Sequence, residues 1–172
     1  MEKIQAHIVG ETISSNSSEA HTLYEKSCFG EPVGDKIQYS ASEALYLLEK
    51  NKLELAQKGK KLSFKELENK LKKIDSRIYL KYAVFKDLRE RGYIVKTALK
   101  FGADFRVYDK GKRPGKAHAK WIVYPVEEES AITWYEFAAK TRVAHSTKKR
   151  LLIGIVDDEC DVTYIEIKWT RP

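Results

Sequence analysis

The chain has 172 residues and a formal net charge of +7, with 42% hydrophobic and 33% charged residues. Apolar residues are spread along its length, which excludes an intrinsically disordered chain, and the positive charge favours a polyanionic partner such as nucleic acid, with plain solubility as the alternative. No apolar run approaches the roughly 20 residues of a membrane span. Residues 1–20 lack a secretory signal, and the two distant cysteines predict reduced thiols, so we expect a cytoplasmic protein without disulfides or a metal site.

In the first half, residues 3–9 alternate between apolar and polar side chains and predict a strand. Residues 13–20 predict a polar loop, and residues 22–34 predict a short strand followed by turns. Two capping boxes, in each of which a serine precedes a glutamate by three positions, begin helices at Ser40 and Ser63.

A turn at residues 58–62 separates these helices, and a third helix runs from Asp75, which can cap it, to a natural stop at Gly92. After Gly92 the pattern changes to short runs rich in β-branched and aromatic residues. The elements predicted there are two strands in 93–109, a basic loop at 109–117, a strand at 119–126, a helix at 133–146, a buried strand at 149–157, an acidic turn and a final alternating strand at 162–169. Pro125 ends the strand at 119–126 or places it at a sheet edge.

These elements predict an α/β (α+β) fold class with two domains. Residues 1–78 form a helix-rich amino-terminal domain with a small sheet, and residues 79–172 form a mixed-sheet carboxy-terminal domain with a helix packed on it.

Three ionisable side chains lie at strand ends in the second half. Tyr108 closes one strand, His118 opens the next, and Lys149 lies in a basic run that opens the buried strand. If these strands are neighbours in one sheet, a connection of about nine residues lets the first two pair as a hairpin, and the three groups meet at one edge. The alternative is a strand-end tyrosine, a surface histidine and a solvated helix cap at 148–150.

Such a trio suits cleavage of RNA without a metal, because RNA carries its own nucleophile, the 2′-OH. A base takes the proton of that hydroxyl, an acid protonates the leaving 5′-oxygen, and a cation stabilises the charge on the phosphate. Histidine can donate a proton at neutral pH, whereas tyrosine can accept one only where neighbouring cations lower its pKa.

Several separated blocks occur in one order: YLKYAVFKDLRERGYIVKTALKFGADFRVYDKG, HAKWIV, RVAHSTKKRLLIGIVD and YIEIKWTRP. Together with SASEALYLLEKNKLEL and LSFKELE, they make the chain resemble the archaeal tRNA-splicing endonucleases. The resemblance implies a restriction-endonuclease-like second half and cleavage of pre-tRNA at the intron–exon junctions of a bulge–helix–bulge, without metal or cofactor. It implies products with 2′,3′-cyclic phosphate and 5′-OH ends.

The family motifs match three positions as catalytic residues, with Tyr108 as the general base, His118 as the general acid and Lys149 stabilising the transition state. His145 is interpreted as structural. The resemblance also matches Arg142 to an arginine that grips a bulge base. We expect further RNA contacts from neighbouring basic residues, namely Lys112, Arg113, Lys116 and Lys148.

The family assembles from four units, and this chain has the length of one unit, so we expect a homotetramer or a heterotetramer with a structural subunit. The acidic turn matches a loop that docks on a neighbouring subunit, through Asp157, Asp158, Glu159 and Asp161; a plain solvated turn is the alternative. The last strand, with Ile165, Ile167 and Trp169, is a dimer edge or packs in the core. Two other functions compete: a non-catalytic RNA-binding or scaffold subunit, and a metal-dependent nuclease.

Overall fold

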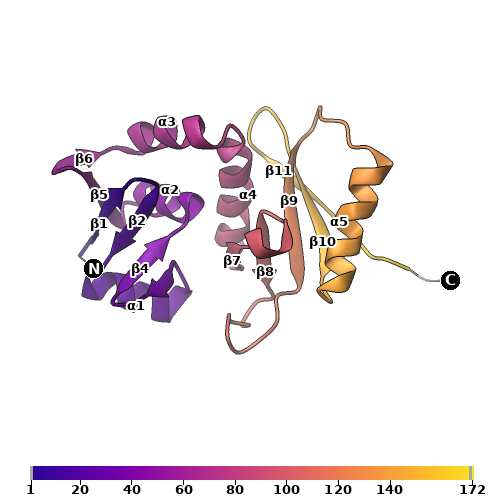
Figure 1. Cartoon of the computed structure of the whole chain (residues 1–172), viewed down its shortest axis with the longest axis horizontal. Coiled ribbons are helices and arrows are strands. Elements are labelled where there is room, and N and C mark those ends of the chain that lie inside the picture. Colours follow the sequence, from indigo (N-terminus) through magenta and orange to yellow (C-terminus); the bar gives the residue numbers. More distant parts are fainter. Residues whose placement is uncertain (1, 171) are drawn as a thin grey trace. The chain divides into compact units, whose positions relative to one another are not determined.

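A computed structural model describes residues 2–170 and residue 172 (Figure 1). The chain divides into two compact units, Met1–Tyr82 and Ala83–Pro172, and the division falls inside a helix. Each unit has its own mixed sheet and its own helices, so the predicted α/β (α+β) fold class is confirmed.

The first unit is built on a six-stranded sheet with the strand order β3-β4-β2-β1-β5-β6. Neighbouring strands are antiparallel except for β1 and β5, which are parallel. The elements are β1 Ile4–Val9, β2 Thr12–Ser15, α1 Ser18–Ser27, β3 Glu31–Val33, β4 Lys36–Tyr39, α2 Ala41–Glu49, β5 Leu53–Gln57, β6 Lys60–Leu62 and α3 Phe64–Ile74. The strand at 3–9 and the helices begun by Ser40 and Ser63 are therefore confirmed.

The predicted polar loop at residues 13–20 is wrong, because this segment forms β2 and the start of α1. The polar sequence is explained by its hydrogen bonds. Ser15 is buried, and its hydroxyl donates to the carbonyl of Gln5, while the Ser17 side chain accepts from the Ala20 backbone N–H and caps α1.

Two smaller predictions in the first unit also need correction. The short strand expected in residues 22–34 is β3, and residues 22–27 belong to α1 instead. The segment at 58–62 is a turn only at its first two residues, because Lys60–Leu62 form β6 and pair with β5.

A buried carboxylate fixes the start of α2 to the rest of the first unit. Glu43 is 4% exposed and accepts hydrogen bonds from the backbone N–H groups of Ser40 and Gly30, each at 2.9 Å. It also accepts from the Ser40 hydroxyl at 2.9 Å. The same capping-box carboxylate therefore holds both the helix terminus and the turn before β4.

The second unit is a five-stranded sheet with the strand order β11-β10-β9-β8-β7. Only β9 and β10 run parallel; the other pairs are antiparallel. The elements, beginning with the helix that crosses the boundary, are α4 Ile78–Glu90, β7 Ile94–Thr97, the 3-10 helix η1 Leu99–Phe101, β8 Phe105–Tyr108, β9 Trp121–Glu127, α5 Trp134–Ser146, β10 Arg150–Val156 and β11 Val162–Ile167. Every helix and strand predicted after Gly92 is present, and β10 is buried as expected.

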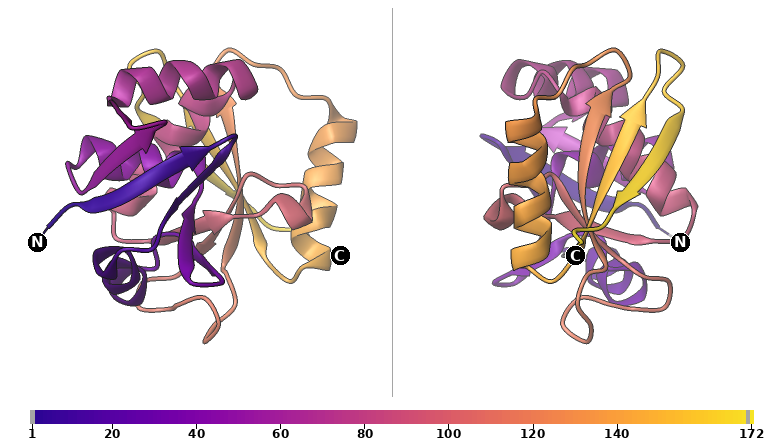
Figure 2. Two further views of the ribbon diagram at one scale, coloured as in Figure 1. Left: turned by 60° about the vertical axis from the view of Figure 1, so that its left-hand side comes forward. Right: turned by 90° about the vertical axis from the view of Figure 1, so that its right-hand side faces the viewer.

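Helices cover both faces of this sheet. On one face, a Cβ at Gly154 of β10 would lie 2.9 Å from Val84 of α4, so glycine permits the close approach of this helix. On the other face, α5 packs over a core that includes Ile122, Ala144 and Leu151. Figure 2 shows α5 lying alongside the strands β9, β10 and β11.

Pro125 lies inside β9, so the expectation that it ends this strand is wrong. Its position still has a physical reason. The pairing of β8 with β9 reaches only to Phe105 and Val123, whereas β10 pairs with β9 along its whole length. Pro125 therefore lies where β9 has a partner strand on one side, which is where a residue without a backbone N–H is tolerated.

We expect Glu43→Ala to lower the free energy of unfolding by about 3 kcal/mol, because it leaves two buried N–H donors without their carboxylate. Glu66 is the matched control, since it makes the same capping box with Ser63 on an exposed helix. Glu66→Ala should cost about 1 kcal/mol or less. Urea unfolding followed by circular dichroism measures both, and equal losses would contradict this role of Glu43.

Candidate active site

Backbone pairing brings the ends of three strands into one row. Lys120 donates its N–H to the carbonyl of Val107 at 2.8 Å, and its own carbonyl accepts from the N–H of Arg150 at 2.9 Å. These bonds continue the registers in which Val107 lies opposite Trp121 and Trp121 lies opposite Arg150. By the same registers, Lys120 lies between Tyr108 and Lys149.

This row sets the spacing of the predicted catalytic residues. Neighbouring strands are about 4.8 Å apart, so the backbones of Tyr108 and Lys149 are separated by roughly 10 Å. His118 precedes Lys120 by two residues, about 7 Å further along an extended chain. The structure thus brings all three residues to the same end of the sheet, as their positions at strand ends predicted.

Tyr108 and Lys149 belong to the same face of the sheet. Arg106 and Tyr108 alternate with Val107 along β8, so their side chains point to one side. The guanidinium of Arg106 is close enough to act electrostatically on the Lys149 ammonium. On this face the Lys149 Nζ also lies 5.1 Å from the centre of the Phe101 ring.

The Lys149 ammonium lies in a setting that disfavours its own charge. Partial burial lowers its pKa first, and repulsion from Arg106 lowers it further. The ammonium donates a hydrogen bond to the carbonyl of Thr147 at 2.9 Å. A phosphate at this position would supply the negative charge that both causes call for.

The turn before β10 fixes where Lys149 lies. α5 ends at Ser146, and Lys148 follows in the left-handed conformation with φ of 55°. The N–H of Lys149 then donates to the carbonyl of Ala144 at 2.8 Å, which is the pattern of a Schellman helix end. Lys149 therefore follows directly from the end of a helix and the start of a central strand.

His118 lies in the basic loop between β8 and β9, and its side chain is exposed. The loop is closed at its base by an ion pair between Lys120 and Asp109 at 3.2 Å, which also lowers the pKa of Asp109. Tyr108 differs from His118 in accessibility, because it is 5% exposed and pairs with Ile94 of β7. The proposed base is the most covered of the three groups.

The remaining predicted site residues lie around this centre or far from it. Arg142 is exposed on α5, and Lys148 is exposed in the turn that follows. The loop residues Lys112 and Lys116 are exposed, and Arg113 is half-buried. The acidic turn, by contrast, lies at the opposite end of β10, seven residues from the Lys149 end.

Two neighbours of the site are not evident in the sequence alone. Arg106 lies two positions before Tyr108, a spacing that in a strand predicts a shared face. Phe101 comes from η1 and carries no such signal, since its approach to Lys149 depends on the folded chain. Within residues 2–170, no group of three or more His, Cys, Asp or Glu side chains is placed to hold a metal ion.

Comparisons with known proteins point to one family. The family model described as tRNA intron endonuclease, catalytic C-terminal domain, matches residues 78–164, and the model of the corresponding N-terminal domain matches residues 4–68. A tRNA-splicing endonuclease of Nanoarchaeum equitans (strain Kin4-M) is 49% identical over 136 residues, which cover 76% of this chain and 87% of the relative.

Two further relatives cover nearly the whole chain. A tRNA-splicing endonuclease of Thermococcus onnurineus (strain NA1) is 40% identical over 171 residues, 99% of this chain and 98% of the relative. Another, of Methanothermobacter thermautotrophicus, is 41% identical over 156 residues, 91% of each chain. Of the helices in the described part of this chain, none has the length and apolar character that a membrane crossing requires.

Replacing Lys148 tests the turn that positions Lys149. We expect Lys148→Gly to raise the free energy of unfolding by about 1 kcal/mol, because glycine adopts a positive φ without a Cβ clash. Lys148→Ala keeps the Cβ and should bring no such gain. Urea unfolding distinguishes them, and equal stability of the two variants would show that the turn is not strained.

The titration of Lys149 tests its electrostatic setting. In an NMR titration of lysine side chains, we expect Lys149 to lose its proton at a lower pH than exposed lysines do, and Arg106→Gln to raise the pKa of Lys149. Arg106→Lys keeps the positive charge and is the control. A Lys149 pKa that is unchanged in Arg106→Gln would contradict repulsion between these two cations.

Proposed function

The chain belongs to the tRNA intron endonuclease family, and we propose that it is a catalytic chain that cuts pre-tRNA at the intron–exon junctions of a bulge–helix–bulge. The observation that supports this most is the row at one end of the second sheet. There, strand register places Tyr108 and Lys149 two strands apart on one face, with His118 close to the strand between them.

In the proposed reaction, Tyr108 takes the proton of the 2′-OH, and the 2′-oxygen attacks the adjacent phosphorus. The bond from phosphorus to the 5′-oxygen breaks, and His118 donates a proton to that oxygen. One proton leaves the nucleophile and one reaches the leaving group, so the products are a 2′,3′-cyclic phosphate and a 5′-OH. Lys149 stabilises the negative charge that develops on the phosphate oxygens.

The RNA backbone around the cut is proposed to contact basic side chains that surround this row. The exposed loop residues Lys112 and Lys116 and the turn residue Lys148 offer cations to phosphates, with Arg113 beside them. Arg142 is proposed to grip a bulge base. It is exposed on α5, two helical turns before Lys149, and its planar guanidinium can stack on a base.

We extend the proposal to a four-subunit assembly, as a homotetramer or as a heterotetramer with a structural subunit. The acidic turn is proposed to dock on a basic surface of a neighbouring subunit. The Asp157 carboxylate accepts from the backbone N–H groups of Glu159 and Asp161 at 2.9 Å and so shapes this turn. Asp158, Glu159 and Asp161 are exposed around it.

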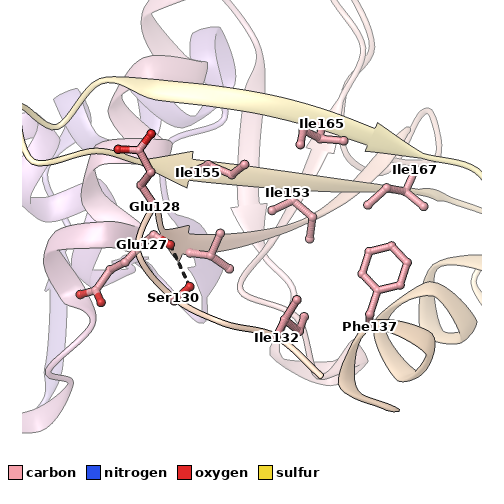
Figure 3. A pocket seen from close by; sticks show the side chains of 10 residues that line it. Glu127, Glu128, Ser130, Ile132, Phe137, Ile153, Ile155, Ile165 and Ile167 are labelled. Atoms are coloured by element: carbon pink, nitrogen blue, oxygen red, sulfur yellow. Dashed lines mark hydrogen bonds between the residues drawn. The ribbon is translucent and has the colours of Figure 1, made fainter. Parts of the chain in front are cut away.

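The edge strand β11 is proposed as a second subunit contact. An apolar groove of about 310 Å³ runs between the sheet and the start of α5. Figure 3 shows Ile165 and Ile167 of β11 facing Ile132 and Phe137 across this groove. Ile165 is 49% exposed, so it is available to a partner, whereas Ile167 already packs against the core.

A cleavage assay tests the chemistry. In single-turnover reactions with a bulge–helix–bulge RNA, we expect cleavage to persist in EDTA, because no step uses a metal. We expect His118→Ala to cut at least about 100-fold more slowly while it still binds the RNA.

His7→Ala is the control, since His7 is an exposed histidine of β1 in the first unit. It should cut at the wild-type rate. Loss of cleavage in EDTA would favour the metal-dependent nuclease instead, and a chain that binds but never cuts would favour the scaffold subunit.

A further inference from the structure

A second pocket lies directly beside Lys149 and is not used by the mechanism above. It has a volume of about 220 Å³ and lies between the end of α5, the start of β10 and the segment that follows β11. The residues that matter for its chemistry are Lys149, Arg150, Lys168, His145 and Trp169. Ala144 and Ile167 form its apolar base.

Two aromatic rings form one side of this pocket. The rings of His145 and Trp169 have their centres 4.2 Å apart, although the residues come from α5 and from the chain after β11. Trp169 is 49% exposed, so half of the indole surface is covered and half is open. A flat, partly open indole that is supported by a second ring is a surface on which a nucleic-acid base can stack.

The charged side chains of the pocket are mostly basic. Glu166 pairs with both Arg150, at 3.0 Å, and Lys168, at 3.8 Å, so one carboxylate is shared by two cations. Lys149 adds a third cation, whose side chain bonds to a neutral backbone carbonyl. The pocket therefore carries excess positive charge beside an aromatic surface, which suits a phosphate joined to a base.

We infer that this pocket binds the nucleotide next to the cut, with its base stacked on Trp169 and its outer phosphate near Arg150 and Lys168. The inference rests on the proposed function, because it takes Lys149 as the contact to the cut phosphate. Lys149 lines the pocket and belongs to the catalytic row, so the nucleotide bound here adjoins the phosphate that is cut. Trp169 is a positioning residue in this account, since it holds the substrate and takes no part in proton transfer.

The test compares Trp169→Ala with Trp169→Phe in single-turnover cleavage of a bulge–helix–bulge RNA. Stacking of one base contributes enough that we expect Trp169→Ala to raise the RNA concentration for half-maximal rate about tenfold. The rate at saturating RNA should change less, and Trp169→Phe should behave nearly as wild type. Trp134→Ala is the control, because Trp134 is 84% exposed at the other end of α5.

A second measurement uses the wild-type protein and changes the RNA. Two substrates lack the base of the nucleotide on the 5′ side or on the 3′ side of the cut. We expect one of them to bind wild type about tenfold more weakly than intact RNA. Trp169→Ala should bind that same substrate and intact RNA equally well, because its stacking partner is already absent.

The outcomes separate the two proposals. If the wild-type protein cuts the RNA but Trp169→Ala and both base-free substrates behave normally, the pocket assignment is wrong and the proposed function stands. If Trp169→Ala changes the mass of the assembly instead of the RNA affinity, Trp169 is a subunit contact, and the pocket assignment is again wrong. If wild type cuts no bulge–helix–bulge RNA, both proposals fail together.

Discussion

The two backbone hydrogen bonds of Lys120 are the constraint on which the site depends. They join β9 to β8 on one side and to β10 on the other, and so they decide which residues end in the same row. Side chains alternate along a strand, so a slip of one residue would turn Tyr108 or Lys149 to the opposite face. The helices α4 and α5 oppose such a slip, because each packs against its own face of the sheet.

The same packing gives Lys149 its chemical character. The end of α5 and the start of β10 hold its side chain beside Phe101 and Arg106, where water is partly excluded and a second cation is near. An anion bound there faces a charge that needs no rearrangement to meet it, which is how preorganised sites stabilise a transition state. The arrangement disfavours the ammonium in the free protein and favours it when a phosphate is present.

Local signals in the sequence predicted much of this fold. The helices capped by Ser40, Ser63 and Thr133 were found because a capping box lies within four consecutive residues. β2 and α1 were missed because their serines are also typical of loops, and their hydrogen bonds exist only in the folded chain. Strand ends indicated the catalytic candidates, but only strand order places them together. The contact between His145 and Trp169 was missed because it depends on the pairing of β10 with β11.

The central claim is that Tyr108, His118 and Lys149 act on one phosphate with separate roles. A substrate whose leaving 5′-oxygen is replaced by sulfur tests it directly, because a thiolate leaves without being protonated. The account predicts that this substrate restores most of the rate lost in His118→Ala, while Tyr108→Phe and Lys149→Ala stay slow. If His118→Ala is no faster on the sulfur substrate than on the natural one, His118 is not the acid, and the proposed mechanism is wrong.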